Sequence, residues 1–150
     1  MPIMNYTTSI EVSKTMGEIQ AALSRRGVTR ISTLFDEDGM AAGLGFTMKT
    51  DYGVRDFELP VRTAGVLAAM KNDPKVSRAQ CNPAQAARVA WRIAKDWLEA
   101  QAALIDAQLA TLDEVMMPYM VAKYDGTRAV TMYGAFRDSQ LAITAGDEEQ

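Results

Sequence analysis

The sequence contains no histidine, and this absence excludes more chemistry than any other feature of its composition. Histidine is the commonest general base and metal ligand near neutral pH, and Ser-His and Cys-His nucleophile pairs depend on it. Cys81 is the single cysteine, so the chain can form neither an internal disulfide nor a thiolate metal cluster. We therefore predict a protein that is not an enzyme and that uses no metal or cofactor.

Long apolar runs are also missing. No segment approaches the ~18 consecutive apolar residues of a membrane span, and the N-terminus lacks the charged and apolar regions of a secretory signal. A net charge of -3 argues against a uniformly basic nucleic-acid-binding surface, although it permits a local basic patch. With 48% hydrophobic and 23% charged residues, we expect residues 1–150 to form a single cytoplasmic domain without a membrane partner.

The first part of the chain, residues 5–71, has the pattern of a sheet with short helices. β-branched residues in the segment 5–12 predict a first strand. Thr15 followed by Glu18 indicates a capping box, and the apolar spacing after it predicts a short helix at about residues 16–26.

Residues 28–61 then contain three extended runs, separated by the turn signals Asp38-Gly39 and Asp51-Tyr52-Gly53. Such runs predict an antiparallel meander. Apolar residues alternate along the second and third runs, which gives the sheet one apolar face: Leu44, Phe46, Met48, Phe57, Leu59 and Val61. Thr63 is expected to cap a second short helix that ends near residue 71.

The second part of the chain opens with a connection at residues 72–82 and continues as one long helix. Asn82 is suited to the N-cap, and Pro83 to the first helical position, where its missing N–H costs nothing. The helical spacing then runs without a break to Pro118, which predicts a helix over residues 83–117.

A hairpin is expected at residues 119–143, with its turn at Tyr124-Asp125-Gly126-Thr127, followed by a frayed tail at residues 144–150. The predicted fold is therefore α+β. It comprises an antiparallel meander of three to four strands, packed by a short N-terminal helix and one long amphipathic helix, with a C-terminal hairpin.

The long helix has an apolar side that exceeds what a small domain can cover. A rod of this length measures roughly 50 Å, whereas a compact domain of this size has a diameter near ~40 Å. The distal half therefore predicts a homo-oligomer or another protein partner. The candidate interface residues are Leu104, Leu112, Val115, Met116, Met117 and Tyr119.

The opposite side of the helix carries Arg88, Arg92 and Lys95, and two interpretations of it stay open. One is an ordinary solvated face. The other is a track for the phosphates of single-stranded nucleic acid, with Trp91 beside it as a base-stacking surface. Three further arginines are candidates for the same patch: Arg25, Arg26 and Arg30.

Three stretches carry a family resemblance: "NYTTSIEVSKTMGEIQAAL", "FELPV" and "AARVAWRIAKDWLEAQAALIDAQLATLDEVMMPY". With them the chain resembles a group of small proteins encoded by bacteriophages and integrated elements. The resemblance implies a phage protein in the bacterial cytoplasm and supplies no catalytic residues. The order helix, meander, long helix also resembles the core of single-strand annealing proteins such as Erf and Red-beta. These proteins assemble as rings or filaments on DNA and grip its backbone with basic residues.

Two functional hypotheses follow. The first is a non-enzymatic, oligomeric phage protein that binds single-stranded nucleic acid as an accessory of DNA recombination or replication. The alternative is a protein-interaction module, an adaptor or inhibitor of a host or phage protein, that acts through the distal half of the long helix.

Overall fold

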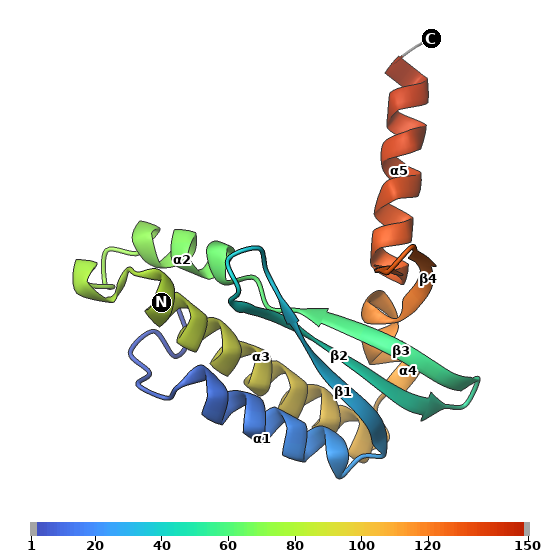
Figure 1. Ribbon diagram of the computed structural model, residues 1–150, viewed down its shortest axis with the longest axis horizontal. Coiled ribbons are helices and arrows are strands. Elements are labelled where there is room, and N and C mark those ends of the chain that lie inside the picture. The colour runs from blue at the N-terminus through green and yellow to red at the C-terminus, as the bar shows by residue number, and fades with distance from the viewer. Residues whose placement is uncertain (1–2, 149–150) are drawn as a thin grey trace.

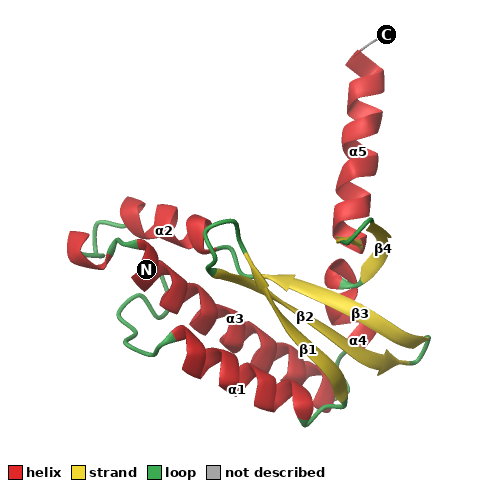
Figure 2. Cartoon of the chain, in the orientation of Figure 1, coloured by secondary structure: helices red, strands yellow, loops and turns green. Residues whose placement is uncertain are grey.

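The chain has the α+β fold that its pattern predicts, as a computed structural model describing residues 3–148 shows (Figure 1). The helices are α1 (Val12–Ser24), α2 (Thr63–Asn72), α3 (Pro83–Asp106), α4 (Leu112–Met116) and α5 (Met132–Glu148), with short 3-10 turns at Arg78–Gln80 and Met117–Tyr119. The strands are β1 (Val28–Phe35), β2 (Ala41–Thr50), β3 (Gly53–Pro60), β4 (Val121–Asp125) and β5 (Arg128–Thr131). The first three strands form an antiparallel meander and the last two a hairpin (Figure 2).

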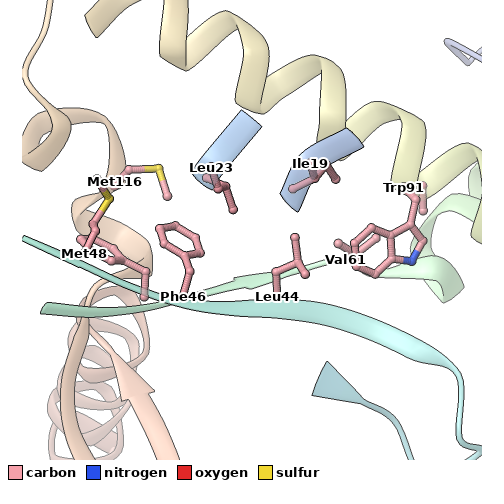
Figure 3. Close-up of a cluster of buried hydrophobic side chains, with 10 residues drawn as sticks. Ile19, Leu23, Leu44, Phe46, Met48, Val61, Trp91 and Met116 are labelled. Carbon is pink, nitrogen blue, oxygen red and sulfur yellow. The ribbon is translucent and has the colours of Figure 1, made fainter. Parts of the chain in front are cut away.

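The core lies between the sheet and two helices. Helices α1 and α3 run side by side over one face of the meander, and their apolar side chains meet those of β2 and β3 (Figure 3). Phe46 and Phe57 are opposite each other in register, and their rings stack with centroids 5.2 Å apart. All six residues of the predicted apolar face are buried, so the period-2 pattern identified the core side of the sheet correctly.

The turns of the meander are those that the sequence predicts. Gly39 and Gly53 have φ of 77° and 104°, a left-handed conformation that glycine adopts without the steric cost of a Cβ. The Asp36 carboxylate also accepts hydrogen bonds from the backbone N–H groups of Asp38 and Met40, each at 2.9 Å. These local contacts set the register of the strands.

The predicted start of the long helix is confirmed. The Asn82 side chain accepts a hydrogen bond of 2.9 Å from the backbone N–H of Gln85, and Pro83 is the first helical residue. The N-terminal prediction is wrong in detail, because residues 5–11 form no strand and α1 begins at Val12. Gln85 explains the difference: its amide donates to two backbone carbonyls of that segment and holds it against α3. Thr15 lies buried inside α1 and caps nothing.

The prediction of one helix over residues 83–117 is also wrong, because α3 ends at Asp106. Gln108 has a φ of 62°, which is incompatible with a continuing α-helix. Thr111 and Glu114 then form a reciprocal capping box, which satisfies the first N–H groups of a separate helix, α4. The chain thus turns back toward the sheet, and α4 places Met116 in the core.

The C-terminal prediction is correct for the hairpin and wrong beyond it. The hairpin turn lies at Gly126, with a φ of 63°, but Met132–Glu148 forms α5 in place of more strand and a tail. The Thr131 hydroxyl accepts a hydrogen bond of 3.1 Å from the backbone N–H of Gly134, which caps the new helix. Helix α5 stands away from the rest of the molecule (Figure 1).

Candidate functional site

The basic face of α3 lies against α1. The Arg92 guanidinium is 2.6 Å from the Glu18 carboxylate, and the Arg92 side chain is only 15% exposed. This hydrogen bond is the main cause that lowers the pKa of Glu18 from its ordinary value. Lys95 lies 2.7 Å from Glu99 and 3.8 Å from Glu18. Two of the cations predicted for a phosphate track therefore have carboxylate partners within the chain.

Arg88 completes the same arrangement one turn earlier. It lies 3.8 Å from Glu11, which precedes α1, and its Nε donates a 2.9 Å hydrogen bond to Gln85. Glu11 and Glu18 are seven residues apart, as are Arg88 and Lys95. Because α1 and α3 run in the same direction, the two spacings match, and the predicted phosphate track forms the ion-pair seam between these helices.

Trp91 is fully buried, which contradicts a base-stacking role. Its ring is 0% exposed in the core between α3 and the sheet (Figure 3), and its Nε1 donates to the carbonyl oxygen of Ala41 at 3.3 Å. A ring without accessible surface has no face to offer to a nucleotide base.

Of the remaining arginine candidates, Arg25 and Arg26 line one cavity together with Lys95, at one end of the seam, whereas Arg30 lies apart. Arg26 forms a bidentate pair with Asp106, with N–O distances of 2.6 and 2.9 Å. Arg25 is exposed just beyond α1 and forms no ion pair within the described residues 3–148. Arg30 is exposed on β1, where it alternates with the core residue Ile31 and thus lies on the opposite face of the sheet. The seven predicted residues do not form one surface.

Four of the six predicted interface residues are used inside the chain. Met116 is buried, and Leu112, Val115 and Tyr119 pack against the core. The Tyr119 ring also meets Trp97 edge-to-face, with centroids 5.6 Å apart. Only Leu104 and Met117 are exposed, because the return of the chain at α4 covers most of the distal apolar stripe.

Helix α5, which the sequence pattern did not predict, carries several exposed large apolar side chains. None of its residues, all of them within the described part of the chain, is buried. Met132, Phe136 and Ile143 follow each other at helical spacing, so they lie within about 40° of one another around the axis. Phe136 is 62% exposed. These three residues are called the α5 stripe below; their spacing of four and seven was the signal in the sequence.

A second apolar feature is concave, and it reaches from the half-buried residues Ala22, Leu98 and Ala102 down to the buried core. A cavity of about 400 Å³ opens between the C-terminal half of α1, the distal half of α3, β2 and α4, and it is called the α1–α3 groove below. Its apolar walls include Ala22, Leu23, Phe46, Leu98, Ala102 and Met116. Figure 3 shows Leu23, Phe46 and Met116 gathered at this end of the core. The charged residues that line it are three cations and two carboxylates: Arg25, Arg26, Lys95, Glu18 and Glu99.

The outer face of the sheet carries a polar contact that fixes the hairpin. The Asp56 carboxylate accepts hydrogen bonds from Thr47 at 2.6 Å and from the Tyr124 hydroxyl at 2.7 Å. Both bonds lower the pKa of Asp56, whereas burial raises that of Glu58 nearby. Over residues 3–148, no three acidic or cysteine side chains converge as a metal site would require.

Comparison with protein-family models, with curated proteins and with solved structures finds no match. No helix in the described part of the chain has both the length and the apolarity needed to cross a membrane.

Proposed function

We propose that this chain is a non-enzymatic protein-interaction module whose recognition element is the α5 stripe. The observation that supports it is a helix of 17 residues without one buried side chain. Helices of that length are marginal in water, and their stability in proteins comes chiefly from packing of an apolar face. The stripe is therefore a surface that a partner covers.

The charges of α5 favour a protein partner over nucleic acid or membrane. The helix carries one cation, Arg137, and three carboxylates: Asp138, Asp147 and Glu148. Phosphates would be repelled by this balance, and helices that lie on anionic membranes are rich in lysine and arginine on the polar face. An amphipathic helix that inserts its apolar side into a groove of another protein fits the same composition.

Single-stranded nucleic acid is a weaker candidate. Of its seven proposed contact residues, Trp91 is inaccessible, and Arg26, Arg88, Arg92 and Lys95 have carboxylate partners. The resemblance to phage-encoded proteins supports the setting of the proposal, an adaptor or inhibitor that acts on a host or phage protein.

Two substitutions with matched exposure test the proposal. Phe136 and Leu141 are each 62% exposed but lie on opposite sides of α5. We immobilise the wild-type protein and the variants Phe136→Gln and Leu141→Gln. Each is incubated with bacterial lysate to which free wild-type protein has been added. The bound proteins are then quantified by mass spectrometry. Circular dichroism checks that all three are folded.

We expect one protein to bind stoichiometrically to wild type and to Leu141→Gln and to be lost with Phe136→Gln. Equal binding to both variants would contradict a role for the stripe. A labelled single-stranded oligonucleotide at low salt is the second arm. Tight binding to it that weakens steeply with salt would favour the nucleic-acid function instead.

A further inference from the structure

We infer that the partner of the α5 stripe is a second copy of this chain, and that α5 of one copy lies in the α1–α3 groove of the other. This inference rests on the proposed function, because it names the partner of the same stripe. The resulting site is incomplete in one chain, since the groove comes from one copy and the helix from the next.

The groove and the helix are complementary in shape. Protein interiors are packed as densely as organic crystals, so an apolar cavity of about 400 Å³ has room for several side chains. Alanines at positions 22 and 102 stand on its two helical walls and leave that room. The α5 stripe presents large side chains, Phe136 and Ile143, on a convex surface.

The two surfaces also agree in length. The α3 wall of the groove runs from Lys95 to Ile105, eleven residues whose ten steps rise about 15 Å along the helix. The segment of α5 from Phe136 to Asp147 has twelve residues, whose eleven steps rise about 16 Å. The two helical segments therefore have nearly the same length, and Met132 of the stripe lies about one turn beyond the groove.

The charges at the ends are opposite in sign. Asp147 follows Ile143 by four residues, so it continues the stripe on the same side of α5. Arg25 lines the groove and forms no ion pair with any residue between 3 and 148. A docked α5 brings a carboxylate to a groove that already holds an unpaired guanidinium.

The same chain cannot fill its own groove. The backbone N–H of Met132 donates a 2.8 Å hydrogen bond to the carbonyl oxygen of Met120, and the Thr131 cap fixes the first turn of α5. With this anchor α5 points away from α1 and α3 (Figure 1).

Pairing of α5 with α5 fits less well than docking in the groove. The seam of such a pair would continue from the stripe through Ser139 and Gly146, which contribute little apolar surface. It would also leave the groove empty. Docking in the groove covers both apolar surfaces at once.

The experiment is light scattering after size-exclusion chromatography across a range of concentrations. Wild type is expected to have at least twice the 16.4 kDa mass of one chain, and Leu141→Gln the same mass. Phe136→Gln and the groove-filling Ala102→Trp should each raise the dissociation constant at least tenfold. The charge pair gives an independent readout: Arg25→Glu and Asp147→Lys should each weaken association, and the double variant should restore it.

A monomer at all concentrations would overturn the inference, while Phe136-dependent capture of a different protein would leave the proposed function standing. Association that responds to Phe136→Gln, but neither to Ala102→Trp nor to the charge pair, would also overturn it in favour of contact between two α5 helices. If Ala102→Trp fails to fold, the charge pair decides.

Discussion

Replacement of Trp91 by alanine distinguishes a core residue from a ligand-binding one. The ring is 0% exposed and packs between α3 and the sheet. Truncation of a buried tryptophan to alanine costs about 3–5 kcal/mol, through lost burial and the cavity left behind. The indole N–H bond to Ala41 is lost as well, and that bond belongs to a class worth about 1 kcal/mol. Since small domains are stable by about 5–15 kcal/mol, the variant should be strongly destabilised yet able to fold.

Urea denaturation followed by far-UV circular dichroism measures this effect without relying on the removed fluorophore. With a slope of about 2 kcal/mol per molar urea, a loss of about 4 kcal/mol lowers the midpoint by about 2 M. Trp91→Phe should lower it less, because most of the buried volume is retained. Trp97, which is half-buried, is the one tryptophan left in that variant. Acrylamide should quench its fluorescence more readily than it quenches that of Trp91 in the wild-type protein.

An unchanged midpoint for Trp91→Ala would refute this reasoning. If the same variant kept its stability but lost affinity for an oligonucleotide, the ring would have to lie on a binding surface and the packing of α3 on the sheet would be wrong. We expect the urea midpoint of Trp91→Ala to fall and its affinity for any binding partner to stay unchanged.

Three further predictions concern stability. Arg92 holds the pKa of Glu18 in the folded protein below its ordinary 4.5. The ion pair therefore contributes its full stability above pH 4.5, and this stability is lost as the pH falls through the lower pKa of the folded protein. On acid titration, the melting temperature of Glu18→Gln should fall less steeply than that of the wild-type protein. Gly43→Ala should lower the free energy of unfolding, measured in urea, by about 1–3 kcal/mol, because the added Cβ would lie 2.8 Å from a backbone oxygen of β3. Gly17→Ala should instead stabilise α1 by about 0.5–1 kcal/mol, because its added Cβ would meet nothing within 4 Å. Asn82→Ala should lower thermal stability by about 1 kcal/mol through loss of the α3 cap, and an unchanged melting curve would show that the cap is dispensable.

The parts of the fold that the sequence predicts well are those set by neighbouring residues. Alternation along β2 and β3, the glycine turns and the Asn82 cap all act within a few positions, so their signals can be read directly. The break after Asp106 was harder to predict because the apolar spacing continues across it. Thr111 and Glu114 have the sequence pattern of a capping box at this point. Because the apolar spacing continues through them, the pattern identifies a new helix only once the first helix is known to end.

The residues of the candidate site lie in a different arrangement from the predicted one because of how α3 packs. A helix with one buried side should expose the opposite one, and on that assumption Trp91 and Arg92 belong to a solvent face. Helix α3 instead contacts the sheet with Trp91 and α1 with Arg92, so two sides of it are covered. Nothing in the local pattern of α3 encodes the position of α1; only the matched spacing of Glu11 and Glu18 on the other segment does.

The cations of α3 are thus paired inside the chain, whereas apolar side chains of α5 are exposed. The cations of α3 are neutralised between two helices, where a nucleic acid would have to compete with carboxylates already 2.6 to 3.8 Å away. Apolar side chains of α5 are exposed to water. Their exposure is unfavourable, and burial against a partner would lower the free energy. Binding driven by such a surface should change little with salt, in contrast to binding of phosphates. Dependence on ionic strength is therefore the simplest property that separates an interaction through the α5 stripe from one through the arginines.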